Sequence, residues 1–514
     1  MAGKRKQRKA EARARRNTAR ATFAPGLGYE GARTSRRLRG WLAERVTINA
    51  LQARGGDVLR ARARQLVRDN AYAASAVDTF VGSAVGDGIT PSPVLSDLGL
   101  KAAIKEAWLR WTDEADADGL TDFYGLQALA ARSMFVAGEC FIRFRPRRAS
   151  DGFSVPLQLQ LIESEQLPLS YNVERSIVGN EIRHGIEFDA IGRRVAYHFL
   201  RRRPGEGELA FGYSPTDITV VPASEVMHLY RPLEAGQIRG QSQLTPAMVR
   251  LYLLDSYDDA ELDRKRVAAM FAGFITKNAI GDPLPVPSRG DAFGLTEDPA
   301  SNEPEIETTL ADLEPGTLQV LNPGEDIRFS NPTEVGGSYE AFQFRNLLAI
   351  AAACGVPYAA LTGDASKGNF SSQRSIELEF KRRVSQFQHQ TLVFQLCRPV
   401  WARWIATAAL AGSVPGLTPT VFNRDKRALS TVRWMPPKWD WVDPLKDLRA
   451  DELAIKMGIM PRSDAIEARG GDAEEIDTRR KEDQDRADGF GLRLDGGTVD
   501  DPNPVPGADA ADAA

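Results

Sequence analysis

The sequence has few of the residues that build disulfide-linked, metal-binding or cofactor-binding sites. Among its 514 residues are 3 cysteines and 4 histidines. Cys140, Cys354 and Cys397 are odd in number and widely spaced, so they predict neither a disulfide framework nor a zinc site. The histidines are scattered along the chain in no ligand spacing. We therefore expect no metal and no cofactor, and a protein that does not need an oxidising compartment.

Long apolar runs are also missing. No stretch reaches the roughly 18 consecutive apolar residues that indicate a membrane-spanning helix, so we expect no membrane partner. The basic N-terminus has no apolar stretch behind it, which argues against a secretory signal. The chain is longer than one compact core usually allows, and its apolar content of 42% is typical of folded proteins, so two or more packed units are expected.

The net charge of -3 conceals a dipolar layout. The first forty residues contain thirteen Lys and Arg against two acidic residues, whereas the last residues lean acidic. We predict a disordered basic arm over 1–40 and a disordered acidic tail over 488–514. The arm is either a solvated tail or a contact for nucleic acid or an assembly partner, and the sequence leaves both alternatives open.

Three short sequence patterns resemble ligand-binding loops, but each lacks a residue or a strand that the binding site would require. The glycine pattern at 26–31 lies in the predicted disordered arm, whereas a dinucleotide site needs a strand before its glycines. The pattern at 363–368 has phosphate-loop glycine spacing, but Asn369 stands where the lysine should follow. The acidic run at 114–119 begins like a calcium loop, but its twelfth position is Gly125, so a solvated acidic turn is the better interpretation.

No pair of residues has a spacing that indicates a catalytic site either. Cys140 and His228 have no spacing that indicates a nucleophile and a base, and a buried strand cysteine is commoner. Glu163 and Glu165 are neighbouring acids in a chain that holds 69 acidic residues, so their proximity carries little weight. We predict that the protein is not an enzyme.

Apolar periodicity predicts an α+β region over the first 240 residues. Three helices come first, and alternating strands follow. The predicted helices lie at 59–85, around 100–111 and at 124–137, and the predicted strands at 141–145, 157–161, 182–188, 195–199, 219–221 and 226–230. The segment 189–192 is expected to form the turn of a hairpin.

Helices dominate the rest of the predicted structure. Thr245 is expected to cap a long helix with Pro246 in its first turn, and Pro399 is expected to kink the longest helix. The stretch 434–441, rich in Pro and Trp, is expected to pack or dock. The predicted helices are 245–271, 339–354, 372–410, 444–457 and 463–468, and short strands are predicted at 317–321 and 326–329.

Several segments together resemble the portal proteins of lambda-type tailed bacteriophages, although no single one is specific. The resemblance covers roughly residues 30–480 and rests on the order and spacing of these segments. They are RARQLVRDNAYA at 62–73, VGDGI at 85–89, DFYGLQ at 122–127, GECF at 138–141, GQSQLTPA at 240–247, AAACGVPY at 351–358, LTGD at 361–364 and NFSSQR at 369–374.

The resemblance implies a phage portal fold and a ring oligomer of about twelve subunits. Its parts would be a wing, a two-helix stem, a clip, a tunnel loop, a long wing helix and a helical crown. They would correspond to an α+β wing at 41–240, a stem helix at 241–271, a clip at 272–334, a second stem helix at 335–360, a tunnel loop at 361–372, a long wing helix at 373–412 and a crown at 413–487.

The resemblance also implies the function. The ring would form a channel at one capsid vertex for DNA packaging and ejection, and double-stranded DNA would pass through it non-specifically. The clip would dock the terminase large subunit and then head-completion or neck proteins, and the wing and crown would meet capsid and scaffolding proteins. The protein would be located in the virion, and in the host cytoplasm during assembly.

Channel contact with DNA calls for a few cations per subunit, repeated around a ring, that touch phosphates without reading bases. Lys367 in the tunnel loop is the first candidate, Asn369 is a polar helper, and Arg374 is a weaker candidate. The alternative for Lys367 is a solvated loop residue that points away from the channel.

Three other functions fit the sequence less well. A head–tail adaptor without motor docking would be shorter and would lack this order of helices and loops. A DNA-acting enzyme would need clustered carboxylates for metal ions, which the sequence does not present. A DNA-binding regulator would need a basic recognition helix, and the near-neutral body argues against one.

Overall fold

The computed structural model describes residues 44–205, 217–270, 274–277, 325–328, 339–366, 368–437 and 444–490. The chain divides into two units, residues 1–54 and 55–514. The description below concerns the second unit, apart from the first residues of α2. The arm at 1–40, its glycine pattern and the tail beyond Phe490 lie outside the described residues.

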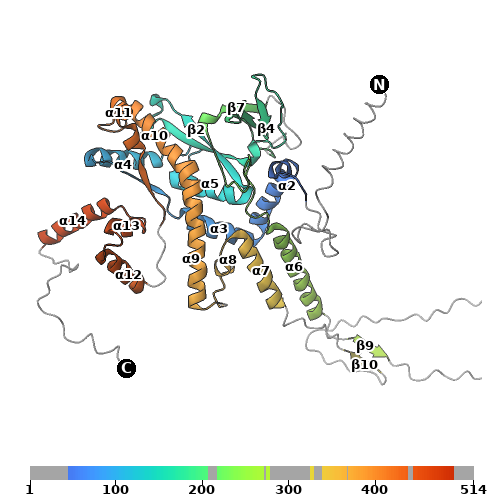
Figure 1. Cartoon of the computed structure of the whole chain (residues 1–514). Helices are drawn as coiled ribbons and strands as arrows, with labels where there is room; N and C mark the ends of the chain where they lie inside the picture. The colour runs from blue at the N-terminus through green and yellow to red at the C-terminus, as the bar shows by residue number, and fades with distance from the viewer. Residues whose placement is uncertain are drawn as a thin grey trace, which may run out of the picture. The chain divides into compact units, whose positions relative to one another are not determined.

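The structure is a mixed fold of helices and short strands, as the sequence predicts (Figure 1). The helices are α2 Ile48–Asp69, α3 Ala71–Val85, α4 Leu98–Thr112, α5 Phe123–Ala137, α6 Met248–Met270, α7 Tyr339–Cys354, α8 Tyr358–Thr362, α9 Phe370–Phe387, α10 Arg398–Ala411, α11 Pro419–Ser430, α12 Pro444–Lys456, α13 Arg462–Glu467 and α14 Ala473–Gly489. The strands are β1 Thr90–Pro93, β2 Glu139–Pro146, β3 Leu157–Glu163, β4 Glu181–Arg183, β5 Ile186–Phe188, β6 Arg194–Leu200, β7 Ile218–Pro222, β8 Val226–Tyr230, β9 Phe274–Lys277, β10 Glu325–Arg328 and β11 Val432–Met435. Within these described ranges, no helix is long and apolar enough to cross a membrane.

A three-stranded sheet in the order β3-β2-β8 lies at the centre of the α+β region. Residues alternate between its two faces, as the strand period requires. One face, with Cys140 and Ile142, packs against helices α4, α5 and α10. The other face, with Phe141, packs against the antiparallel sheet β4-β5-β6-β7. The sheet is therefore buried on both sides, which explains why β2 is apolar along most of its length.

Four tryptophans form the densest part of the helical layer. The Trp108 ring centroid lies 5.0 Å from those of Trp111, Trp401 and Trp404. The indole nitrogens of Trp111 and Trp401 donate to the carbonyls of Leu157 and Leu429, at 2.7 and 2.9 Å. The cluster joins α4 to α10 across nearly 300 residues of sequence because large aromatic rings bury much apolar area in few contacts.

The helix predicted at 59–85 is two helices. Asn70 has φ -111° and ψ 121°, which is extended backbone, and its side chain accepts a hydrogen bond from Ala73 N–H at 3.0 Å. This cap starts α3 and separates it from α2. The apolar face over Ala73–Ala84 continues the pattern of α2, so periodicity alone does not locate the break.

The strand predicted at 182–188 is likewise two strands. β4 and β5 join through His184 and Gly185, at φ 52° and 78°. Two consecutive left-handed residues form the two-residue turn that suits a tight hairpin. The hairpin expected around 189–192 is confirmed, with Gly192 at φ 81° between β5 and β6.

The structure differs from the predicted helices in two further details. α6 begins at Met248, because the Thr245 hydroxyl donates back to Ser242 O at 2.7 Å instead of capping the helix. Around Pro399, the chain from Gln388 to Cys397 is a π-helix, and Arg398 keeps helical angles at φ -63° and ψ -47°. The π-helical hydrogen bonds continue as far as the turn before Pro399, which has no N–H to donate. The chain then continues as the α-helix α10.

The C-terminal helices return to the first part of the chain. β11 pairs with β1, which places Trp434 opposite Pro91. Asp472, at the start of α14, accepts hydrogen bonds from Lys105 and, at 2.8 Å, from Ser92. Burial opposes ionisation, but these two donors lower the pKa of Asp472 to about 2. α14 is not among the predicted helices, since it buries only Ala487 and so has no apolar stripe.

Two glycines allow the backbone to cross itself at the start of β2. Gly138 has φ 92°, and a Cβ on it would lie 2.3 Å from the carbonyl carbon of Gln241. A Cβ on Gly240 would lie 2.2 Å from the carbonyl oxygen of Gly138. The end of α5 therefore touches the segment that leads into α6, backbone against backbone.

Replacing Gly138 with Ala tests this crossing. We expect Gly138→Ala to lower the free energy of unfolding by about 3 kcal/mol or more, because the new methyl group meets main-chain atoms that cannot rotate away. Urea denaturation followed by circular dichroism measures the loss. Gly152→Ala is the matched control, since Gly152 has φ 83° but open space around it, and we expect a loss of about 1 kcal/mol. Equal losses would contradict the crossing.

Candidate functional site

The predicted polar loop lies between α8 and α9, as the sequence indicates. Gly355 ends α7 at φ 76°, and Pro357 stands immediately before α8. The chain therefore turns within the short segment between these two helices. Gly363 ends α8 at φ 74° and donates its N–H to Ala359 O at 2.8 Å. The loop therefore begins and ends at well-defined helix caps.

Helix α3 holds the base of this loop. The Ser75 hydroxyl donates to Leu361 O at 2.8 Å, and the Thr79 hydroxyl lies 3.3 Å from Ala360 O. These hydroxyls satisfy the free carbonyls at the C-terminal end of α8. The end of α8 is therefore attached to the body of the protein through side chains nearly 300 positions earlier in the chain.

Hydrogen bonds inside the loop shape the described residues. The Asp364 carboxylate accepts from the Ser366 N–H at 2.9 Å and from the Ser366 hydroxyl at 2.6 Å. Gln373, in the first turn of α9, donates to Ala365 O at 2.9 Å. The loop is thus tied to the helices on both sides of it.

The three candidate contact residues have different positions. Lys367 lies outside the described residues. Asn369 caps α9, and its side-chain oxygen accepts from Ser372 N–H at 2.8 Å. Arg374 forms an ion pair with Asp447 of α12 at 3.2 Å, with both side chains about one-third exposed. Asn369 and Arg374 thus have structural roles in addition to any contact with DNA, and the structure brings Arg374 to the C-terminal helices.

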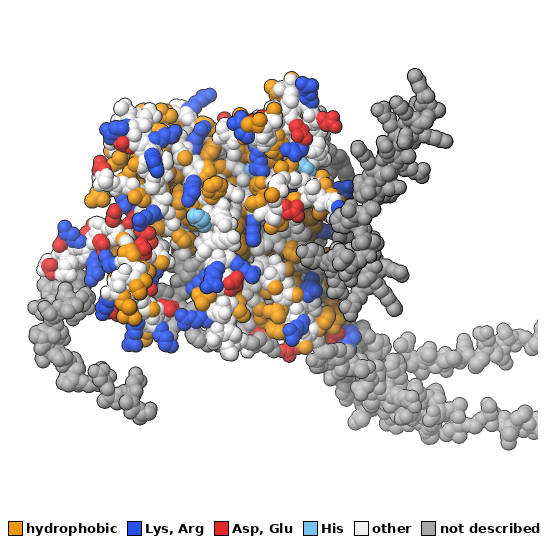
Figure 2. All heavy atoms as spheres, in the orientation of Figure 1, with side chains coloured by type: hydrophobic (Ala, Val, Ile, Leu, Met, Phe, Trp, Pro, Cys, Tyr) orange, Lys and Arg blue, Asp and Glu red, His pale blue; other side chains and the backbone are white. Residues whose placement is uncertain are grey.

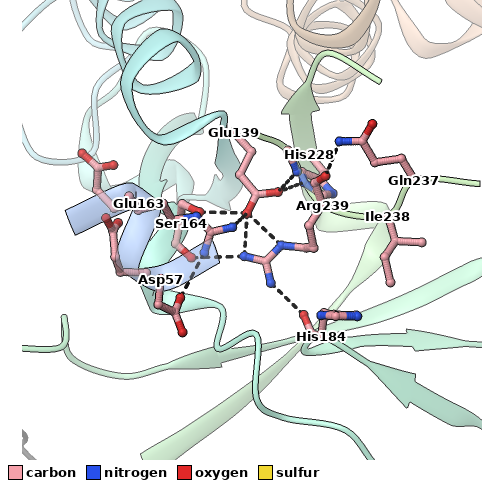
Figure 3. A network of polar contacts seen from close by, with 12 residues as sticks. Asp57, Glu139, Glu163, Ser164, His184, His228, Gln237, Ile238 and Arg239 are labelled. Atoms are coloured by element: carbon pink, nitrogen blue, oxygen red, sulfur yellow. Dashed lines mark hydrogen bonds and ion pairs between the residues drawn. The ribbon is translucent and has the colours of Figure 1, made fainter. Parts of the chain in front are cut away.

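A second polar constellation, which sequence reasoning missed, surrounds Glu139 (Figure 3). This carboxylate is fully buried at the first position of β2. Its Oε1 accepts from Arg60, Arg239 and Ser164, at 2.7, 2.7 and 2.8 Å. Its Oε2 accepts from the Gly240 N–H at 2.7 Å. One buried anion therefore joins α2, the end of β3 and the segment before α6.

The two arginines decide the charge state of this carboxyl group. Burial by itself would raise the pKa of Glu139, but Arg239 and Arg60 hold it well below its usual range. Arg239 is fully buried and also donates to the His184 and Ser164 carbonyls, at 2.8 and 3.3 Å. Glu139 is therefore an anion, and nearly all of its lone pairs have partners.

His228 completes the network in its neutral form. Burial, together with Arg194 and Arg239, lowers its pKa to about 4, although Glu139 opposes this shift. Nε2 lies 2.9 Å from Glu139 Oε2, and Nδ1 lies 3.1 Å from the Arg194 guanidinium. The neutral tautomer that fits both contacts donates from Nε2 and accepts at Nδ1. His228 thereby connects Glu139 to a third arginine, Arg194 on β6.

The register of the central sheet removes the possibility of a Cys140–His228 pair. Cys140 lies opposite Leu229, and Phe141 lies opposite His228. The thiol and the imidazole therefore point to opposite faces of the sheet. Burial raises the pKa of the Cys140 thiol well above its ordinary value, which disfavours a nucleophilic thiolate.

The neighbouring acids Glu163 and Glu165 belong to an ion-pair cluster with Arg64, at 2.5 Å to each carboxylate. The acidic turn at 114–119 is less solvated than the sequence predicts. Asp116 is buried, and its oxygens accept from the backbone N–H groups of Asp118 and Leu120, at 3.1 and 2.9 Å. Within the described ranges, no group of three or more His, Cys, Asp or Glu side chains is placed to hold a metal ion.

One signal in the sequence pointed to the Glu139 network without identifying it. The segments at 138–141 and 240–247 both contribute to the resemblance to one family, and in the structure they touch. A glutamate directly before the apolar run at 140–142 is itself a hint, because buried charges need partners. Its partners come from about 80 and 100 positions away, and no local spacing reveals them.

Comparisons with known proteins agree with one another. The model of the phage portal proteins of the lambda family matches residues 34–388. The chain is 26% identical to a probable portal protein of Halomonas phage phiHAP-1, over 85% of this chain and 82% of that protein. It is 24% identical to the portal protein of Escherichia phage N15 and 23% identical to portal protein B of Escherichia phage lambda, over 88% of this chain and 87% of each relative.

Among solved structures, the chain is similar to one from the neck of a native gene transfer agent particle computed with C12 symmetry. The TM-score is 0.43 at 15% identity, and the match covers 80% of this chain and 92% of that chain. A chain of the native gene transfer agent virion gives a TM-score of 0.42 at 15% identity, with 97% of that chain covered.

The Glu139 network predicts a large loss of stability when its charge is removed. We expect Glu139→Gln to lower the free energy of unfolding by about 3–5 kcal/mol at neutral pH, because Arg60 and Arg239 would stay buried without an anion. Urea denaturation of both proteins measures the difference. Glu163→Gln is the matched control, since its ion pair with Arg64 is partly exposed, and we expect a loss of about 1 kcal/mol.

The pH dependence of stability gives a second test with the same variant. The pKa of Glu139 is lower in the folded chain than its ordinary value of 4.5. Its contribution is therefore complete above that value and is lost as the pH falls through the folded pKa. The stability difference between wild type and Glu139→Gln should shrink below about pH 4.5. A difference that stays constant down to acid unfolding would count against a buried anion.

Proposed function

Because the chain belongs to the lambda family of phage portal proteins, we propose that it forms a closed ring of about twelve subunits at one capsid vertex. Double-stranded DNA would pass through this ring during packaging and ejection. The observation that carries the proposal is the family match, whose range of residues 34–388 includes α6, α7 and the polar loop. The named relatives are structural portal proteins.

The packing of α6 against α7 supports the assignment of a two-helix stem. The Tyr257 ring lies 4.9 Å from the Phe342 ring, and the Tyr339 hydroxyl donates to Asp258 at 3.0 Å. β9 and β10 pair as antiparallel strands at the two ends of 278–324, in the segment assigned to the clip. The assignments of wing (41–240), clip (272–334), tunnel loop (361–372), long wing helix (373–412) and crown (413–487) follow the same order.

The partners follow from these parts. The clip is proposed to dock the terminase large subunit first and head-completion or neck proteins later. The wing and crown are proposed to contact capsid and scaffolding proteins. The subunit would be made and assembled in the host cytoplasm and would remain in the virion.

Lys367 is the proposed channel cation, in a loop whose base is attached to α3 by Ser75 and Thr79. A cation repeated around a ring contacts the phosphates of a duplex without selecting a sequence. Arg374 contributes less, because Asp447 already balances its charge. Asn369 contributes mainly by fixing the start of α9.

Electron microscopy and native mass measurement of the purified protein test the ring. We expect rings with a central hole slightly wider than a DNA duplex, about 20 Å or more across. Monomers or dimers alone at every salt concentration would contradict the proposal. A head–tail adaptor would form rings that do not bind the terminase large subunit in a pull-down, and metal-dependent cleavage of plasmid DNA would favour an enzyme.

The loop cation gives a functional prediction. We expect Lys367→Ala to assemble into rings normally but to reduce DNA packaging several-fold in an in vitro packaging assay, with a weaker effect at high salt. Lys426→Ala, on the exposed part of α11, is the matched control and should package like wild type. Equal packaging by the wild type and both variants would contradict a DNA contact of Lys367 in the channel.

A further inference from the structure

Helix α7 carries a groove on one of its sides. The groove has a volume of 470 Å³ and lies between α3, α7, α8 and α9. Its walls are largely apolar, and Leu348 and Ile376 remain 40% and 53% exposed. Asp364 and Glu377 also line it, and no basic residue does so among the described residues. This surface, the α7–α9 groove, is therefore apolar and acidic.

The other side of α7 carries a second exposed apolar surface, which it shares with the first turns of α6. Val249, Leu253 and Phe342 are 69%, 59% and 48% exposed around a hollow of 420 Å³. Arg250 is the one charged side chain that lines it in the part of the chain that the structure describes. Figure 2 shows hydrophobic and basic side chains mixed over the region of α6 and α7. This surface, the α6–α7 patch, is apolar and basic.

The geometry of α7 separates these two surfaces. Its buried stripe contains Leu347, Ile350, Ala351 and Cys354. At about 100° per residue, Phe344 and Leu348 fall on one side of that stripe and Phe342 falls on the other. Each subunit thus has two different apolar surfaces that face different ways. A cyclic ring requires such a pair, because its interface joins two unlike surfaces of neighbouring copies.

We infer that the α6–α7 patch of one subunit packs into the α7–α9 groove of the next subunit. The inference rests on the proposed ring and identifies the surfaces that close it. Exposed apolar patches of this kind mark interaction sites. The opposite charges favour a second copy as the occupant, since Arg250 and Glu377 are both exposed and neither forms an ion pair with another described residue. In the ring, Arg250 would lie beside Glu377 of its neighbour.

Charge reversal with rescue tests this interface. We expect Arg250→Glu and Glu377→Arg each to raise the concentration needed for half-maximal ring assembly at least about tenfold, because like charges would then meet in a partly desolvated contact. The double variant should recover most of the loss, since the pair is restored with its signs exchanged. Sedimentation velocity over a concentration series measures assembly, and circular dichroism verifies that each variant is folded.

Arg110→Glu is the matched control, because Arg110 is an exposed arginine on α4, outside both surfaces. It should assemble like wild type. If wild-type rings form and both single variants assemble equally well, or if the double variant recovers nothing, the interface is wrong although the ring stands. If the wild-type protein forms no rings, the proposed function itself fails.

Discussion

The buried carboxylate of Glu139 is the interaction on which the connection between the central sheet and helices α6 and α7 depends. It lies at the point where the backbone at Gly138 crosses the segment that leads into α6. Removing an anion from water costs several kcal/mol, and Arg60 and Arg239 offset this cost only because their positions are fixed. The network therefore contributes little net stability compared with an apolar core, but it permits one arrangement of the chains that meet there.

That arrangement extends to the loop through a chain of short contacts. Gln243, three residues after Gly240, donates to the Cys354 carbonyl at 2.8 Å and so joins the start of α6 to the end of α7. From there, Gly355 and Pro357 lead into α8, whose end is held by α3. The N-terminal end of α6, the C-terminal end of α7 and the base of the loop are thus held together by one connected set of contacts. In the proposed ring, a displacement of the wing would be transmitted to the loop through these contacts.

Local pattern predicted what depends on local chemistry. The bounds of α7 were predicted at Tyr339 and Cys354, because an apolar stripe ends there at a glycine and a proline. The mixed α+β class was also predicted. The break at Asn70, the turn at His184 and the pairing of β1 with β11 were not, since each depends on one capping residue, two left-handed residues or a partner far along the chain. Glu139 lies in one of the segments that carry the family resemblance, but its role depends on arginines far along the chain.

Several of the positive charges of α9 are paired within the subunit. Arg374 is balanced by Asp447, and Arg382 and Arg383 each lie 3.7 Å from Glu379. Paired arginines release few counterions when DNA approaches, so they add little to the affinity for phosphate. A strongly basic channel would bind the duplex and slow its movement, and an acidic one would repel it. In the proposed ring, Lys367, a few positions before a helix whose arginines are paired, would be the intermediate case, in which contact with DNA is frequent and brief.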